Sequence, residues 1–236
     1  MIEKYINRTE FDSYEDLKNN YRVTVPADFN FAYDIVDAWA KEDPYKPALL
    51  YCNDNGERRL YTFCDMALMS NRAANYFLSL GIGKGDRVLL MLKQRVEAWV
   101  CILALCKIGA VCIPATFQLT EKDIVYRCNA AEVKAVITVA DKNITDSVIA
   151  SLPKCKTVLH YAVVGDKIPE GASDFRKDYS GCSDVLERIP NLSSDPMLMY
   201  FSSGTTGMPK MILHSYAYPL GHIITAKFWQ QTEEGK

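Results

Sequence analysis

Residues 202–210 form a run of small, flexible and hydrogen-bonding residues that closes on a proline and a lysine. In order they are Ser202, Ser203, Gly204, Thr205, Thr206, Gly207, Met208, Pro209 and Lys210. The run has too little apolar surface and too much backbone freedom to form a buried helix or strand by itself. Its backbone N–H groups, hydroxyls and single ammonium group are suited to surrounding an oxyanion. The pattern therefore predicts a phosphate-binding loop, called the phosphate loop below.

The spacing of the phosphate loop differs from that of a Walker A loop. Walker A requires G-x-x-x-x-G-K-[ST], in which the hydroxyl after the lysine binds magnesium. Here Gly204 and Gly207 are separated by two residues, and Met211 follows the lysine. A flexible surface linker is the structural alternative for this composition. Apolar runs at 197–201 and 211–213 flank the loop, and two buried strands around it favour a functional loop held by rigid elements.

The string from Tyr200 to Lys210 resembles, position for position, the signature loop of the AMP-forming adenylating enzymes. This superfamily includes acyl-CoA synthetases, luciferases and peptide-synthetase adenylation domains. Residues 85–90 and 107–114 are similar to an early strand–helix unit and a G-A-V-x-x-P turn of the family, and residues 118–124 resemble its medium-chain acyl-CoA synthetase branch. The resemblance runs from about residue 31 to the end of the chain. A peptide-synthetase adenylation domain is the alternative within the superfamily.

The resemblance implies an ATP-dependent acid–thiol ligase. In that chemistry a carboxylate substrate attacks the α-phosphate of ATP to give an acyl-adenylate and pyrophosphate, and coenzyme A then displaces AMP to form a thioester. Negative charge builds up on the departing phosphates, so hydrogen-bond donors and a cation that close over them stabilise the transition state. Mg²⁺ normally shares this task. The implied cofactors are therefore ATP, Mg²⁺ and coenzyme A.

The resemblance also assigns roles within the phosphate loop. All nine residues are expected to surround the ATP phosphates, with Thr206 and Lys210 as the catalytic pair. Thr205 and Thr206 would donate hydroxyl and amide hydrogen bonds, while Gly204 and Gly207 would let the backbone approach without a Cβ. Lys210 would supply the positive charge; a solvated lysine at the start of a strand is its structural alternative.

Beyond the loop, the residues allow two interpretations each. Gln118 matches a position associated with coenzyme A binding in the medium-chain branch, and a turn glutamine bonded to nearby backbone groups explains it equally well. Tyr216, Phe228 and Trp229 belong to a segment that in relatives follows the loop beside the acyl pocket, so they line that pocket or pack in the core. Trp99 is expected to pack in the core.

Composition points to a soluble enzyme and excludes several other classes. The 236 residues are 49% hydrophobic, which is enough for a substantial core, and the net charge of −2 gives no footprint for nucleic acid or an anionic membrane. No apolar stretch has transmembrane length and the N-terminus has no signal-peptide core, so we expect a cytoplasmic protein. Eight cysteines without a C-x-x-C pair indicate free thiols, and the three histidines do not cluster, so no structural metal is predicted.

The elements that must position the loop alternate between strands and helices. Thr62 with Asp65, and Thr120 with Asp123, predict capped helix starts, and Gly109 predicts a helix end. Apolar strands separated by helices predict an α/β fold with a mainly parallel sheet flanked by helices. Helices are expected near 31–39, 62–80, 95–108, 120–130 and 145–152, and strands near 48–52, 58–62, 87–92, 111–113, 135–139 and 157–164. The polar residues 165–195 are predicted to form a long surface connection.

The expected domain organisation is an N-terminal extension, residues 1–30, followed by an incomplete N-terminal ATP- and acyl-binding domain, residues 31–236. The C-terminal lid domain of the adenylate-forming fold is expected to be absent, so the chain alone would be inactive. The alternative is a free-standing, non-catalytic fragment that binds nucleotide weakly or binds a partner. An incomplete domain would leave apolar surface uncovered, which predicts self-association.

Overall fold

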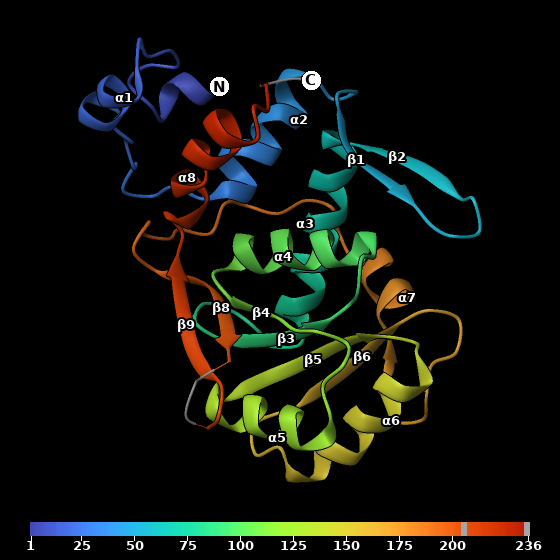
Figure 1. Ribbon diagram of the computed structural model, residues 1–236. Coiled ribbons are helices and arrows are strands. Elements are labelled where there is room, and N and C mark those ends of the chain that lie inside the picture. The colour runs from blue at the N-terminus through green and yellow to red at the C-terminus, as the bar shows by residue number, and fades with distance from the viewer. Residues whose placement is uncertain (204–206, 234–236) are drawn as a thin grey trace.

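The computed structural model describes residues 1–203 and 207–233, which form a seven-stranded sheet with helices on both faces (Figure 1). The strand order is β7-β6-β5-β3-β4-β8-β9, and every neighbouring pair is parallel except the antiparallel pair of β8 and β9. The predicted α/β fold with a mainly parallel sheet is therefore confirmed. The strands are β3 (Arg87–Met91), β4 (Val111–Pro114), β5 (Val133–Val139), β6 (His160–Val164), β7 (Ser173–Asp174), β8 (Pro196–Ser202) and β9 (Lys210–Ser215).

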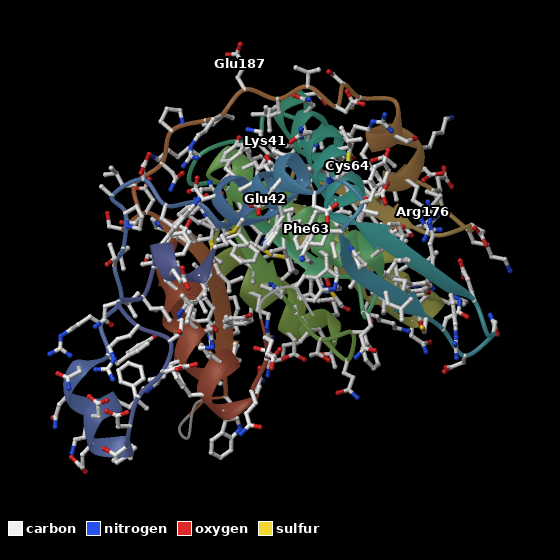
Figure 2. All side chains as sticks on the ribbon, turned by 90° about the horizontal axis from the view of Figure 1, so that it is seen from above. Lys41, Glu42, Phe63, Cys64, Arg176 and Glu187 are labelled. Atoms are coloured by element: carbon white, nitrogen blue, oxygen red, sulfur yellow. The ribbon has the colours of Figure 1, made fainter. Side chains whose placement is uncertain are left out.

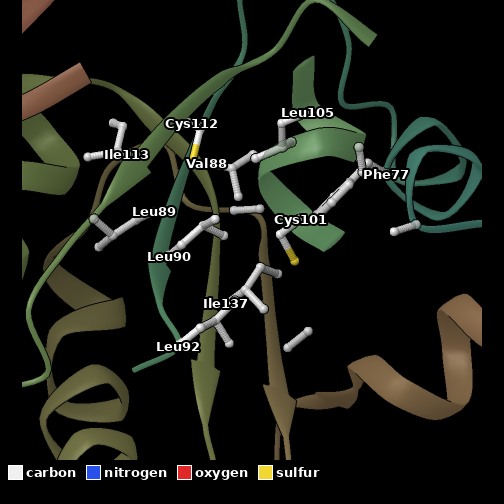
Figure 3. Packing of buried hydrophobic residues seen from close by; sticks show 14 of the residues in the cluster. Phe77, Val88, Leu89, Leu90, Leu92, Cys101, Leu105, Cys112, Ile113 and Ile137 are labelled. Atoms are coloured by element: carbon white, nitrogen blue, oxygen red, sulfur yellow. The ribbon is translucent and has the colours of Figure 1, made fainter. Parts of the chain in front are cut away.

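The core lies on both faces of the central strands because these strands are almost entirely apolar. Val88 and Leu89 of β3 are fully buried, and Ile137 of the neighbouring β5 lies opposite Leu90 of β3 (Figure 3). Cys101 and Leu105 of α4 cover this region from above. One face of the sheet carries α3 (Phe63–Ser79) and α4 (Val96–Ile108), and the other carries α5 (Glu121–Ala130) and α6 (Lys142–Ser151).

The helix boundaries follow the predicted capping residues. Thr62 accepts a hydrogen bond from the backbone N–H of Asp65 while the Asp65 carboxylate accepts one from the backbone of Thr62, which completes a capping box at the start of α3. Thr120 and Asp123 form the same reciprocal pair at the start of α5. Gly109 ends α4 with a left-handed φ of 76°, a conformation that favours glycine. All three predictions are confirmed.

The prediction of a long surface connection over 165–195 is wrong in part. This segment contains the edge strand β7 and the helix α7 (Phe175–Ser180). Phe175 is fully buried and packs between Tyr76 and Phe77 of α3 and Tyr179 of its own helix, with ring centroids 5.0–6.0 Å apart. One aromatic side chain thus anchors an otherwise polar segment to the core.

The remaining elements surround the upper face of the molecule in Figure 1. Residues 1–30 carry α1 (Tyr14–Asn20), and Phe11 and Tyr21 contact the ring of Phe228 edge-on near the other end of the chain. A π-helical turn (Ala32–Asp37) leads into α2 (Ala38–Glu42), and the predicted hairpin is present as β1 (Pro47–Cys52) and β2 (Arg58–Thr62). A short helix, α8 (Tyr218–Gly221), follows β9 and is succeeded by a π-helical turn (Thr225–Trp229). The prediction that Trp99 packs in the core is wrong, because its side chain is about half exposed on α4.

Candidate functional site

The phosphate loop joins β8 to β9 at the edge of the sheet where the parallel strands end. The two strands pair in antiparallel register, with Phe201 opposite Met211 and Ser202 opposite Lys210. The ends of the loop are therefore held together by the hairpin ladder. Gly204, Thr205 and Thr206 lie outside the described residues, so their predicted roles stay predictions.

The described part of the loop is exposed and contains one special backbone position. Gly207 has a φ of 140°, which L side chains rarely adopt, and apart from its chain neighbours no atom of the described residues lies within 4 Å of the place where a Cβ would stand. The backbone conformation at position 207 therefore requires glycine, whereas the space around it would admit a side chain. Ser203 and Met208 on either side of the undescribed residues are exposed to solvent, whereas Pro209 is half-buried.

Lys210 lies at the exit of the phosphate loop, and its predicted role in binding the ATP phosphates stays a prediction. It begins β9, its side chain is exposed, and no residue in the described ranges forms an ion pair or hydrogen bond with its ammonium group. In an antiparallel pair, residues directly opposite each other project their side chains to the same face. The ammonium of Lys210 and the hydroxyl of Ser202 therefore belong to one face of the hairpin, at the base of the loop.

A long-range contact that no sequence pattern indicates holds the exit of the loop. Tyr126 of α5 donates a hydrogen bond from its hydroxyl to the carbonyl oxygen of Pro209, 2.9 Å away. Its ring meets Phe201 of β8 edge-on at 6.2 Å, and the guanidinium of Arg127 lies 5.2 Å from the centre of the same Phe201 ring. Tyr126 and Pro209 are 83 positions apart, so no local pattern could have linked them. The helix α5 thus supports the loop from below.

Gln118 lies in the loop after β4, at the same edge of the sheet as the phosphate loop. Its backbone N–H donates to the Thr116 hydroxyl, while its exposed side-chain amide has no hydrogen-bond partner within the described ranges. The described residues therefore do not contain the side-chain bonds of the turn-glutamine alternative, and the coenzyme A role of Gln118 stays a prediction. The neighbouring Phe117 ring lies under the ammonium of Lys93, 4.9 Å from its centre, which connects this loop to the one after β3.

The expectation that two buried strands flank the loop is wrong for β9, and in β8 only Leu198 is buried. Met211, Ile212 and Leu213 are each between 43% and 53% exposed. The cause is the position of β9 at the end of the strand order, where nothing in residues 1–203 and 207–233 pairs with its outer edge. An apolar run is buried only if neighbouring elements cover it, and here the run forms an exposed apolar edge.

The aromatic residues after the hairpin do not converge on a pocket beside the loop. Tyr216 is fully buried and donates a 2.7 Å hydrogen bond to the carbonyl oxygen of Cys106, and burial raises its pKa well above the ordinary value. Phe228 packs with residues of the N-terminal segment, and the Trp229 side chain is 84% exposed. Tyr216 is therefore a core residue, in agreement with the packing interpretation.

Other ligand classes find little support in the described part of the chain. No group of three or more His, Cys, Asp or Glu side chains there could hold a metal ion. All eight cysteines are free thiols, and burial raises the pKa of the Cys106 thiol to about 12, which makes it unreactive near neutral pH. No helix in this part of the chain is long and apolar enough to cross a membrane.

The loop geometry can be set beside known proteins. The family model described as AMP-binding enzyme matches residues 36–235. The chain belongs to the AMP-binding enzyme family. It is 32% identical over 226 residues to the mitochondrial acyl-coenzyme A synthetase ACSM3 of Mus musculus and 34% identical over 215 residues to ACSM5 of Homo sapiens. The predicted resemblance to medium-chain-type acyl-CoA synthetases is confirmed.

These relatives are much longer than the chain. The alignments cover 93% and 88% of this chain but only 39% and 37% of the two relatives. Among solved structures, that of the anthranilate CoA ligase AuaEII in complex with anthranoyl-AMP matches with a TM-score of 0.73 and 22% identity, over 87% of this chain and 38% of that one. This likeness confirms the adenylate-forming fold of the described region.

Proposed function

We propose that this chain supplies the ATP-phosphate-binding part of an AMP-forming acid–thiol ligase. In the proposed reaction a carboxylate attacks the α-phosphate of ATP, pyrophosphate leaves, and the acyl-adenylate passes its acyl group to the thiol of coenzyme A. The observation that carries this proposal is the hairpin that holds Lys210, which has no ion-pair partner among the described residues, opposite Ser202 at the base of the phosphate loop. Membership of the family and the acyl-CoA synthetase relatives support it.

The residues of the chain would bind and orient the phosphates of ATP. Lys210 would place its ammonium beside the β- and γ-phosphates, where charge increases as pyrophosphate leaves. Ser202 and Ser203 would donate hydroxyl hydrogen bonds, and Gly207 would allow the backbone of the loop to approach an oxyanion. Thr205 and Thr206 would add hydroxyl and amide donors, with Thr206 acting together with Lys210.

The three implied cofactors fit the residues to different degrees. The loop donors suit the phosphates of ATP, and the exposed, unpartnered amide of Gln118 suits a polar group of coenzyme A. The described residues hold no cluster of carboxylates that would bind Mg²⁺. We therefore propose that Mg²⁺ reaches this part of the site with the phosphates of ATP.

The test compares ATP with AMP, because only ATP carries the β- and γ-phosphates. We expect Lys210→Ala to weaken ATP binding by about tenfold, the loss of one charge-assisted contact, and to leave AMP binding unchanged. Lys18→Ala, on exposed α1, is the matched control. Carboxylate-dependent ATP–pyrophosphate exchange by the product of the full reading frame tests the reaction itself, and Thr206→Ala is expected to reduce it. Equal ATP affinity for wild type and Lys210→Ala would refute the loop assignment.

The exposed edge of β9 favours a second candidate function, in which the chain is not catalytic and associates with a second copy of itself. Unpaired strand edges bearing apolar side chains template pairing with another chain, so we propose antiparallel pairing of β9 with a second copy. Sedimentation should then show dimers that Ile212→Lys disperses and Leu60→Lys, on the exposed β2, does not. Monomers at all concentrations would exclude this candidate without touching the ligase proposal.

We also propose a domain organisation and a cellular location for the protein. Residues 1–30 are proposed to be an extension of the ATP- and acyl-binding domain, which limited proteolysis would release first. A reducing compartment, the cytoplasm, is proposed from the eight free cysteines, five of which are buried. Because the relatives named above include mitochondrial proteins, fractionation of cells that express the tagged full reading frame must separate cytoplasm from mitochondria.

A further inference from the structure

A cavity of about 320 Å³ lies at the carboxyl ends of β3, β5 and β6, on the edge of the sheet that also carries the phosphate loop. Its floor consists of Val139, Ala140, Val164 and Gly165, and its charged lining consists of Lys93, Arg95, Asp141, Asp166, Lys167 and Arg176. The lining thus contains four basic and two acidic side chains. This site is called the basic cavity below.

The floor of the basic cavity is rigid. The backbone N–H of Ala140, just after β5, donates a 2.9 Å hydrogen bond to the carbonyl oxygen of Val164 at the end of β6. Gly165 follows with a φ of 147°, and a Cβ at this position would stand only 2.5 Å from the Cβ of Ala140. The two loops therefore approach so closely that only glycine fits, and the sheet itself sets the shape of the cavity.

Two of the four cations are partly neutralised by the protein. The ammonium of Lys93 lies 2.7 Å from the Asp141 carboxylate, and this hydrogen bond lowers the pKa of Asp141. Arg176, labelled at the periphery of Figure 2, is held from behind by Glu97, whose carboxylate is 4% exposed. Such pairs fix the direction of the basic side chains as well as their charge.

The other two cations have no such partner. Arg95 and Lys167 form no ion pair or side-chain hydrogen bond within residues 1–203 and 207–233, and both are exposed at the mouth of the cavity. Asp166 beside Lys167 is the single acidic side chain of the lining that no basic side chain contacts within salt-bridge distance in the same ranges. The cavity consequently carries a net positive charge with two unused donors, one of them a guanidinium.

The position of the cavity in the sheet is one where α/β proteins bind ligands. From β3 the chain proceeds to β4 on one side and then returns to add β5 on the other. Ligands bind outside the carboxyl ends of the strands at such a reversal. Lys93 links this point to Phe117, next to Gln118. With about 4.8 Å between strands, the end of β5 lies roughly 14 Å from that of β8, which bears the phosphate loop.

We propose that the basic cavity binds a phosphate monoester, gripped by Arg95 and Lys167 and flanked by Lys93 and Arg176. A guanidinium and an ammonium suit a phosphate because they supply several charged donors in a fixed arrangement. The phosphate has two sources with the same chemistry, the 3′-phosphate of coenzyme A or a free nucleotide phosphate. The first source rests on the proposed function, whereas the binding of a phosphate monoester does not.

The test measures binding to the 236-residue chain by calorimetry with adenosine 3′,5′-bisphosphate as the probe. We expect the double variant Arg95→Gln/Lys167→Gln to bind this probe at least about tenfold more weakly than wild type. The matched double variant Arg58→Gln/Lys18→Gln removes the same charge from β2 and α1 and is expected to bind within about twofold of wild type. ATP binding at the phosphate loop is expected to be unchanged in both.

Coenzyme A and dephospho-coenzyme A then separate the two sources. If Arg95→Gln/Lys167→Gln weakens the binding of coenzyme A as well as that of the bisphosphate but leaves the binding of dephospho-coenzyme A unchanged, the 3′-phosphate of coenzyme A is the occupant. If the double variant binds the bisphosphate and inorganic phosphate more weakly but binds coenzyme A as wild type does, a free nucleotide phosphate is the occupant. If Lys210→Ala leaves the ATP affinity unchanged while Arg95→Gln/Lys167→Gln still weakens binding of the bisphosphate, the proposed function is refuted and the basic cavity is not. No binding of the bisphosphate to wild type at millimolar concentration, or equal binding to the double variant, overturns the basic cavity.

Discussion

A single hydrogen bond, from the Tyr126 hydroxyl to the Pro209 carbonyl oxygen, fastens the exit of the phosphate loop to α5. The substitution Tyr126→Phe removes this bond and nothing else, because the ring that meets Phe201 edge-on is retained. The change therefore separates the positioning of the loop from the packing beneath it. If α5 holds the loop ready for the phosphates of ATP, loosening its exit must cost affinity for them.

The magnitude follows from the kind of bond that is lost. A neutral hydrogen bond contributes about 0.5–1.5 kcal/mol net, and a larger penalty applies only when its partner is left buried without water. Pro209 is half-buried, so its carbonyl oxygen can bond to water in the variant, and the cost stays near 1 kcal/mol. For a chain of 236 residues this corresponds to a fall in Tm of about 2–4 °C. If the same energy orders the loop for ATP, affinity falls about fivefold.

The assay measures the Tm and the affinities for ATP and AMP for wild type, Tyr126→Phe and Tyr14→Phe. Tyr14 is 71% exposed on α1, so its variant controls for the loss of a hydroxyl. We expect Tyr126→Phe to weaken ATP binding about fivefold and AMP binding hardly at all, because AMP lacks the β- and γ-phosphates that the loop is proposed to hold. A lower Tm with unchanged ATP affinity would show that the bond stabilises the fold but does not position the loop.

Three further predictions concern the frame around the site. Phe175→Ala should lower the free energy of unfolding in urea by about 3–5 kcal/mol, and a loss below 1 kcal/mol would contradict the anchoring of α7. The hydrogen bonds from the Thr120 hydroxyl and then its backbone lower the pKa of Asp123 below the ordinary 3.8. Their stabilisation is present above the unfolded-state pKa and is lost as pH falls through the folded-state pKa, so Asp123→Asn should be less stable than wild type at pH 7 and equally stable in acid. A pH-independent difference would count against this capping role. Tyr216→Phe should cost only about 1 kcal/mol, because the Cys106 carbonyl oxygen still accepts from the Asn30 amide at 3.0 Å; a loss above 3 kcal/mol would mean that this second bond does not compensate.

The features that the sequence predicts well are those set by neighbouring residues. The capping boxes at Thr62 and Thr120 depend on residues three positions apart, and both are present. The buried strands β3, β5 and β6 follow from continuous apolar runs between helices. The two apolar runs that flank the phosphate loop are strands as predicted, although the sequence did not predict that they pair as an antiparallel hairpin.

The features that the sequence does not predict depend on residues far apart in the chain. Phe175 is one apolar residue in a polar segment, and it becomes a core residue because it packs against Tyr76 and Phe77 of α3. The support of the loop by Tyr126 has the same origin, since it joins α5 to the hairpin. Whether Ile212 is buried depends on which element pairs with the edge strand β9. Trp99 is about half exposed because the described residues cover only part of its side chain.

The strand order explains why the candidate groups can serve one elongated ligand. Because β8 runs parallel to β4 and β9 returns, the phosphate loop opens on the same edge as the loops after β3, β4, β5 and β6. Along this edge the order is the basic cavity with Arg95, then Gln118, then Lys210, although in the sequence Gln118 and Lys210 lie on opposite sides of β5 and β6. A ligand with a phosphate at one end that reached the phosphate loop with the other would have to pass Gln118. Within the described residues the Gln118 amide and the cations of Arg95 and Lys210 on either side of it have no partner, and we therefore propose that they are successive contacts along one path.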